Sequence, residues 1–269
     1  MPWADEGERS MWLNAVAGFG VGTLVGITGV GGGSLMAPIM ILVFGIAPAT
    51  AVGTDLWFAA ITKSFGGVIH HRNGGVDTQV LKRLCMGSLP AAVATLCFLA
   101  FSGMGQVKDG LILHALGGVL IVTSIATLFR HRFVEWSRNY QRDAGHEALN
   151  VQAPLTILAG AILGVLVTLT SVGAGALGVT MILCLYPLRM SARKLVATDI
   201  VHAIPLTLIG GIGNLYMGTV NLPLLGGLLL GSIPGIIVGS LAARRIPETG
   251  LRIVLALVLM IVGVRTLLH

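Results

Sequence analysis

Glycines cluster near the beginning of the chain, where the sequence reads GVGGGS from Gly29 to Ser34. Glycine lets the backbone leave helical geometry, so four glycines within five residues favour a break between two helices. A helix that begins at such a break presents unpaired backbone N–H groups, which attract anions. The alternative is close packing of helices through small residues. The residues expected to form an anion site here are Gly31, Gly32, Gly33 and Ser34.

A second, less glycine-rich stretch runs from Ser171 to Ala176 and reads SVGAGA. We expect it to mark a second helix break, with Gly173 and Gly175 adding backbone N–H groups to the same site. Non-helical backbone is tolerated at membrane depth only when it is buried in protein or lines a cavity.

Two Thr-Asp pairs, Thr54-Asp55 and Thr198-Asp199, each stand near the start of an apolar segment. Thr and Asp suit the first turn of a helix, so capping explains them as well as function does. In the functional interpretation, Thr54 and Thr198 face the solute, and Asp55 or Asp199 holds a coupling ion such as sodium or a proton.

Lys63 is the one basic residue well inside a predicted span. A charge at that depth is costly and usually functional, and here it could face an anionic solute. The alternative is that the side chain snorkels to the nearer membrane face. His202 also lies within a span, where a single histidine is more often a packing residue.

The composition is that of a protein whose solvent is the lipid bilayer. Hydrophobic residues make up 55% of the 269 residues and charged residues only 10%, with a mean hydropathy of +0.90. Soluble domains carry about 25% charged residues. The sequence contains no GxSxG motif and no carboxylate pair inside a span. We therefore expect no enzyme, no cofactor, no metal site and no nucleic-acid partner.

Ten apolar segments follow one another along the chain. A helix needs about 20 residues to cross a hydrocarbon core of about 30 Å, and the second segment of each half is shorter than that. The expected fold is all-α: a polytopic integral membrane protein with eight to ten membrane segments, two of them short or re-entrant. The segments are 12–28, 33–46, 51–70, 79–102, 110–129, 153–170, 173–187, 195–216, 221–243 and 251–268.

The chain repeats itself. Val52–Asp55 matches Val196–Asp199 at an offset of 144, and Gly87–Pro90 matches Gly231–Pro234 at the same offset. The glycine stretches and the pair 74–77 and 218–221 match in the same order. We predict a first repeat at 12–129, a cytoplasmic linker at 130–152 and a second repeat at 153–268.

Basic residues orient the two repeats. Five segments per repeat place the second repeat in the membrane with the opposite orientation. With the N-terminus outside, 13 of the 17 Lys and Arg residues fall in predicted inner regions, as the positive-inside rule requires. Inverted repeats are typical of secondary transporters, and some channels are also built this way.

The stretch from Gly18 to Trp57 resembles the signature of the sulfite exporter TauE/SafE family. The matching positions are Gly29, Gly31, Gly32, Gly33, Pro38, Ala51, Gly53 and Thr54. The resemblance implies a permease of the bacterial cytoplasmic membrane, with sulfite or sulfonates among the substrates. This chain departs from the pattern in its weaker second glycine motif and in the aspartates that follow Thr54 and Thr198.

The sequence therefore predicts a secondary transporter for a small, sulfur-containing anion that works by alternating access. An anion channel is the alternative. Import and export, the coupling ion (sodium or proton) and a homodimeric assembly stay open.

Overall fold

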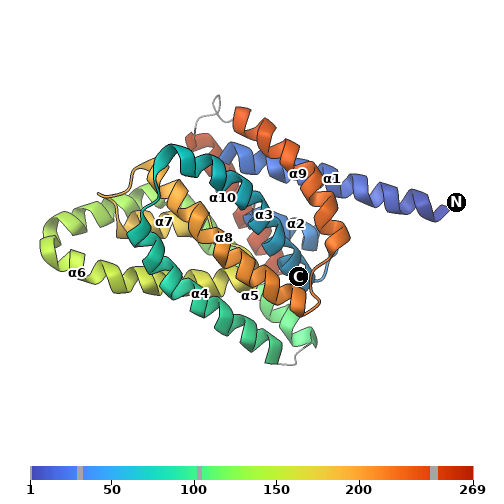
Figure 1. Ribbon diagram of the computed structural model, residues 1–269, viewed down its shortest axis with the longest axis horizontal. Helices are drawn as coiled ribbons and strands as arrows, with labels where there is room; N and C mark the ends of the chain where they lie inside the picture. The colour runs from blue at the N-terminus through green and yellow to red at the C-terminus, as the bar shows by residue number, and fades with distance from the viewer. Residues whose placement is uncertain (1, 29–32, 102–104, 243–247, 269) are drawn as a thin grey trace.

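The computed structural model describes residues 2–28, 33–101, 105–242 and 248–268 (Figure 1). Helices are the only regular secondary structure among these residues, as the sequence predicts. The helices are α1 (Pro2–Thr28), α2 (Gly33–Leu42), α3 (Pro48–Gly74), α4 (Thr78–Phe101), α5 (Gly105–Leu128), α6 (Arg130–Thr170), α7 (Ala176–Leu185), α8 (Ala192–Tyr216), α9 (Leu222–Ala242) and α10 (Glu248–Leu267).

Local capping explains several of the helix starts. Pro48 opens α3, where its missing N–H costs nothing. The Ser191 hydroxyl accepts from the Lys194 N–H at the start of α8. Asp77 and Asn221, at equivalent positions of the two repeats, accept from backbone N–H groups in the first turns of α4 and α9.

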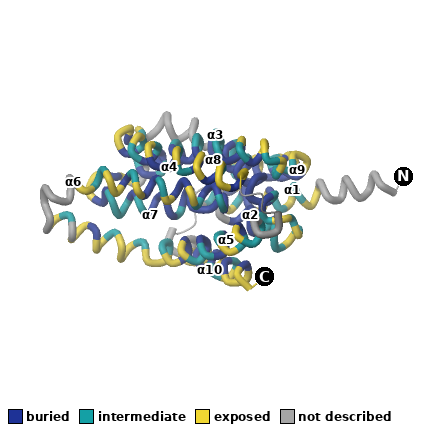
Figure 2. The backbone as a smooth tube through the Cα atoms, turned by 90° about the horizontal axis from the view of Figure 1, so that it is seen from below, coloured by how far each residue is buried: buried dark blue, intermediate teal, exposed yellow. Residues whose placement is uncertain are grey.

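Five helical stretches among the described residues are long and apolar enough to cross a bilayer. The stretch in α8 is the most central, since 61% of it is buried, against 33–44% for the other four. Figure 2 shows the buried residues concentrated around α3, α7 and α8, with exposed residues on the outer helices. The five stretches are Thr78–Phe101, Asp109–Leu128, Val151–Thr170, Lys194–Tyr216 and Leu222–Gly239.

The short helices α2 and α7 have 10 residues each, which corresponds to about 15 Å, or half a hydrocarbon core. After α7, the Tyr186 hydroxyl lies 2.8 Å from the Thr156 hydroxyl, near the beginning of the apolar part of α6. The chain therefore runs inward along α6, breaks, and returns along α7 to the same end of the molecule. The helix α7 is re-entrant, which is one of the two arrangements that the short segment allows.

The two repeats are interleaved. The first helix of each repeat packs most extensively on the fourth helix of the other, which pairs α1 with α9 and α6 with α4 (Figure 1). The third helices, α3 and α8, pack on each other, and so do the last helices, α5 and α10. Each repeat in the sequence is thus only part of a folded body.

Glycines let the helices of the two pairs α1–α9 and α4–α6, called here the crossed pairs, approach each other closely. A Cβ atom on Gly22 of α1 would lie 2.4 Å from the Ser232 carbonyl oxygen of α9. A Cβ on the equivalent residue Gly164 of α6 would lie 2.3 Å from the Ser88 carbonyl oxygen of α4. Such backbone contact is the usual role of small residues between membrane helices.

The predicted linker is helical and continuous with the following span. The helix α6 doubles back at its far end (Figure 1), so its first arm, 130–142, also reaches the end of α7. The Gln141 amide donates to the Leu185 carbonyl at 2.8 Å, and the Ser137 hydroxyl donates to the Cys184 carbonyl. The first arm of α6 therefore caps the C-terminus of α7.

Candidate functional site

Four ionisable side chains meet between α3 and α8, in the centre of the molecule. Asp55 and Lys63 come from α3, and Asp199 and His202 come from α8. Their exposed fractions are 0%, 6%, 3% and 1%, so none is open to solvent. Buried charges are expensive unless they are paired, and inside a membrane they usually mark a functional site.

The helix break at 171–175 lies against this group of side chains. Ser171 ends α6 in the left-handed conformation with a φ of 58°, and Gly173 and Gly175 have φ values of 116° and 143°. Glycine adopts such angles at little cost, which explains why the break contains two glycines. The sequence predicted this break, and the structure confirms it.

Lys63 binds the break directly. Its Nζ atom donates to the Ala174 carbonyl oxygen over 2.6 Å. The ammonium also interacts electrostatically with both the Asp55 and the Asp199 carboxylates. Lys63 is therefore held inside the protein near both acids and does not snorkel to the surface.

Each aspartate lies beside a short helix of its own repeat, Asp199 at the first turn of α7 and Asp55 at the second turn of α2. A Cβ atom on Gly178 of α7 would lie 2.4 Å from Asp199 Oδ1, so glycine is what admits the carboxylate. Asp55 faces the Ala37 backbone of α2 and the Ser171 hydroxyl. No described residue closes a hydrogen bond of normal geometry to either Asp55 oxygen or to Asp199 Oδ1.

Thr54 and Thr198 each bind a backbone N–H of the opposite repeat, a contact that the sequence did not reveal. The Thr54 hydroxyl accepts from the Asn221 N–H at 3.0 Å, and the Thr198 hydroxyl accepts from the Asp77 N–H at 3.0 Å. Both threonines are fully buried. Each therefore holds the chain just before the fourth helix of the opposite repeat, and neither caps its own helix.

His202 has one satisfied ring nitrogen. Its Nε2 atom lies 2.8 Å from the Ser88 hydroxyl of α4, whereas Nδ1 has no hydrogen-bond partner among the described residues. The imidazole thus links α8 to α4 and leaves one nitrogen available inside the protein.

The first predicted glycine site is only partly described. Gly31 and Gly32 lie outside the described residues, and Gly33 and Ser34 open α2. The structure therefore brings Lys63, Asp55, Asp199 and the 171–175 break together. The candidate site residues remain predictions, since these contacts test no role in binding.

The Ala174 carbonyl was missed, because an alanine carries no signal in the sequence. Ser171 belonged to the predicted break but was not chosen as a site residue. One signal in the sequence could have pointed to both residues: Lys63 and Thr207 occupy equivalent positions in the two repeats, but only Lys63 is charged. A lysine with no counterpart needs an acceptor from somewhere else in the fold.

With both carboxylates ionised and Lys63 charged, the three side chains carry one net negative charge. The residues of known placement contain no group of three or more metal-ligating side chains. Buried charged side chains beside a re-entrant helix are typical of the class of membrane proteins that move small ions or solutes.

Comparison with known proteins agrees with this class. The model of the sulfite exporter TauE/SafE family matches residues 14–266, so the chain belongs to that family. The probable membrane transporter protein YjnA of Bacillus subtilis is 39% identical over 249 residues, which cover 92% of this chain and 96% of the relative. The probable membrane transporter protein MJ0441 of Methanocaldococcus jannaschii is 28% identical, with 95% of each chain covered. No solved structure gives a significant match.

Proposed function

We propose that this protein is a secondary transporter that carries a small sulfur-containing anion, sulfite or an organosulfonate, across the cytoplasmic membrane by alternating access. The observation that carries the proposal is the buried contact of Lys63 with the helix break, close enough to Asp55 and Asp199 to interact with both electrostatically. The family description supports the substrate class.

Electrostatic repulsion is the reason for coupling the anion to a proton or a sodium ion. An incoming anion needs the two features that the aspartates now use, namely the Lys63 ammonium and the N-terminus of a short helix. It can take them only when a proton or a sodium ion neutralises a carboxylate, since two anions at one buried cation repel each other strongly. The anion and the neutralising cation therefore bind together and cross together.

Burial favours alternating access over a channel. The charged groups of the site have exposed fractions of 0–6%, and a channel needs a continuous open path. The moving bodies are not the two halves of the sequence, because α1 packs on α9 and α4 on α6. We infer that these crossed pairs move as units relative to α3 and α8.

The test is uptake of labelled sulfite and of a labelled sulfonate into proteoliposomes, with an imposed proton gradient, a sodium gradient or none. Wild-type protein should accumulate the anion above the outside concentration with one of the two gradients. Lys63→Met should abolish accumulation, because the site then holds two carboxylates and no cation. Lys82→Met removes an exposed lysine of α4 and should transport normally.

Asp199→Asn separates coupling from binding. This variant removes the need for a neutralising cation, so downhill flux should persist while dependence on the gradient is lost. Melting temperature and gel-filtration profile establish that each variant is folded. Flux that only equilibrates in the wild type, whatever the gradient, would establish a channel instead. Normal accumulation by folded Lys63→Met would exclude this site.

A further inference from the structure

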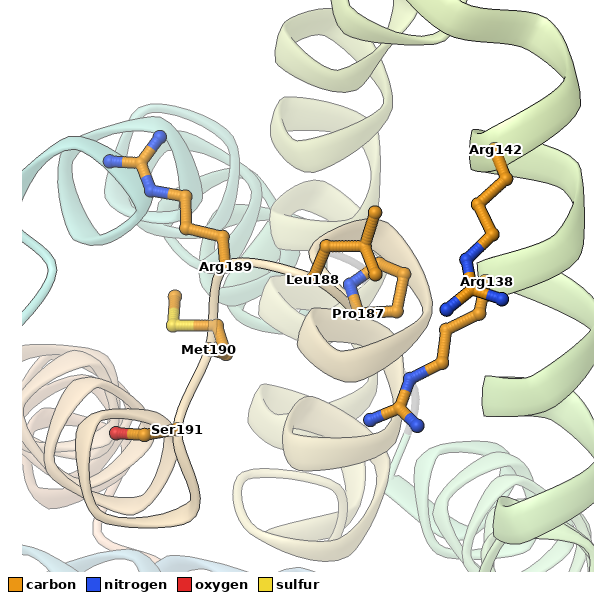
Figure 3. Close-up of a pocket in the computed structure, with 7 residues that line it drawn as sticks. All are labelled: Arg138, Arg142, Pro187, Leu188, Arg189, Met190 and Ser191. Carbon is orange, nitrogen blue, oxygen red and sulfur yellow. The ribbon is translucent and has the colours of Figure 1, made fainter.

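A second basic site lies at the end of the molecule where α4 and α8 begin. Arg138 and Arg142, on the first arm of α6, extend toward the loop 187–191 (Figure 3). With that loop they line a cavity of about 480 Å³. This volume is within the range of small-ligand sites. The cavity is separate from the buried site around Lys63.

The two arginines differ from the other basic residues at this end in their partners. Arg83 donates to the Tyr186 hydroxyl at 2.9 Å, Arg189 forms two bonds with Asp77, and Lys194 lies 3.2 Å from the same carboxylate. In Figure 3, Arg189 turns away from the two arginines of α6. Neither Arg138 nor Arg142 forms an ion pair with a side chain of known placement.

The position of the two arginines is fixed by the residues that precede them. Ser137 and Gln141 donate to the last carbonyl groups of α7, which fixes the arm against the loop. Arg138 and Arg142 are thus held one helical turn apart on the same face, where like charges repel each other. An anion between them would remove that repulsion, and planar guanidinium groups match the oxygens of phosphate and sulfo groups.

The N-terminus of α8 adds positive potential to the cavity. Ser191, its cap, lines the cavity. Aromatic side chains on the same arm of α6 are exposed, with Phe133 at 43% and Trp136 at 70%. Arginines beside exposed aromatic residues are typical of the membrane interface, where lipid headgroups lie.

We propose that this cavity binds a tetrahedral oxyanion, held by Arg138 and Arg142 at the N-terminal end of α8. The oxyanion could be the phosphate of an anionic phospholipid or a soluble sulfate-like ion at the mouth of the transporter. The exposed aromatic residues favour the phospholipid. Because the same arm caps α7, binding here stabilises the short helix whose other end forms the buried site.

Two measurements on the full-length protein distinguish the sources. In the lipid arm, native mass spectrometry counts phosphatidylglycerol bound after titration from a neutral detergent. In the soluble arm, the melting temperature is followed as inorganic phosphate or sulfate is added in the same detergent. Arg138→Gln and Arg142→Gln should each weaken binding about tenfold, as loss of one charge-assisted contact implies. Arg132→Gln, an exposed arginine of the same arm outside the cavity, is the matched control.

Weaker binding in both cavity variants, with the control unchanged, supports the site. If the loss occurs in the lipid measurement, the oxyanion is a phospholipid phosphate, and if it occurs in the melting measurement, the oxyanion is a soluble ion. Equal binding by wild type, cavity variants and control would overturn the proposal in either arm. So would an equal loss in all three variants, since that indicates general attraction to basic residues. Transport of sulfite by the variants is scored separately, so failure here does not affect the proposed function.

Discussion

Asp77 and Asn221 occupy equivalent positions in the two repeats, and only Asp77 carries a charge. Both side chains cap a helix, and both backbone N–H groups donate to a threonine of the opposite repeat. Asp77 alone also binds Arg189 and Lys194. Asp77, the charged residue of the two, therefore lies at the end of the molecule that the distribution of basic residues predicts to be cytoplasmic.

Asp77→Asn should separate the ion pairs from the cap, because asparagine retains a capping oxygen. We expect the melting temperature to fall, with a loss of about 1–3 kcal/mol for the charge-assisted bonds. Asp77→Ala should cost a further 0.5–2 kcal/mol or so, since the cap is lost as well. Thermal unfolding in detergent measures both. Equal melting temperatures for the wild type and Asp77→Asn would show that the ion pairs contribute nothing.

The same residue predicts a pH dependence. Burial disfavours the charged form, but the Val80 N–H, Lys194 and Arg189 outweigh it and hold the pKa of Asp77 below its ordinary value. Because the pKa is lower in the folded protein, ionised Asp77 contributes its full stabilisation at pH values above its ordinary pKa of about 3.9. This stabilisation is lost as the pH falls through the lowered pKa. The difference in stability between wild type and Asp77→Asn should therefore be constant at neutral pH and shrink below about pH 4. A constant difference down to pH 2 would contradict this assignment.

Gly178→Ala tests whether the position of Asp199 matters for transport. The added Cβ atom would lie 2.4 Å from Asp199 Oδ1, so the carboxylate must turn away from α7. We expect sulfite accumulation to fall at least about tenfold, which corresponds to about 1.4 kcal/mol, while the protein stays folded. Gly118→Ala, which meets nothing within 4 Å, is the control for adding a methyl group to a membrane helix. Unchanged accumulation by Gly178→Ala would show that transport does not use this contact.

At the scale of helices, the crossed pairs α1–α9 and α4–α6 depend on glycines that face backbone. Gly22→Ala should destabilise the protein by about 1–3 kcal/mol, because its Cβ atom would lie 2.4 Å from the Ser232 carbonyl oxygen. Gly20→Ala, two residues away on the same helix, meets nothing within 4 Å and should be neutral or stabilising. Melting temperatures of the two variants measure the difference. Equal values would mean that α1 and α9 are not held this closely.

The sequence predicted the helices well, because apolar length and glycine breaks are local signals. The predicted segment 195–216 is α8 (Ala192–Tyr216) almost to the residue, and 79–102 is α4 (Thr78–Phe101). It missed the first ten residues of α1, Pro2–Met11, because this stretch is rich in charged residues and a hydrophobicity criterion excludes it. The predicted linker, 130–152, contains the first arm of α6, and the sequence could not show that side chains of this arm cap α7.

The pairing of helices could not be predicted in the same way. A repeat in the sequence shows that two halves share a fold, but it does not show which faces meet. The contact of Lys63 with the Ala174 carbonyl joins residues 111 positions apart, and only the fold decides it. Likewise, the sequence allowed the threonines either to cap their helices or to face a solute, but it could not predict that each hydroxyl binds a backbone N–H of the other repeat.

At the scale of the whole molecule, the predicted orientation can be measured by labelling. In a variant whose native cysteines, Cys85, Cys97 and Cys184, are replaced by serine, Tyr216→Cys and Lys82→Cys should lie on opposite faces. Tyr216 ends α8 with an exposed fraction of 89%, and Lys82 is exposed near the start of α4. An impermeant maleimide applied to intact cells should label Tyr216→Cys only, and inverted vesicles should reverse this. Labelling of Lys82→Cys in intact cells would place the N-terminus inside.

The interleaving of the repeats also constrains how the protein is made. A ribosome finishes α1 at Thr28 and does not reach the start of α9 until Leu222. At 5–20 residues per second, this delay lasts about 10–40 s. During that time the glycine face of α1 has no partner from its own chain and lies against lipid or the insertion machinery. Nascent chains released before α9 should therefore be targets for membrane proteases, however completely their first five helices have been inserted.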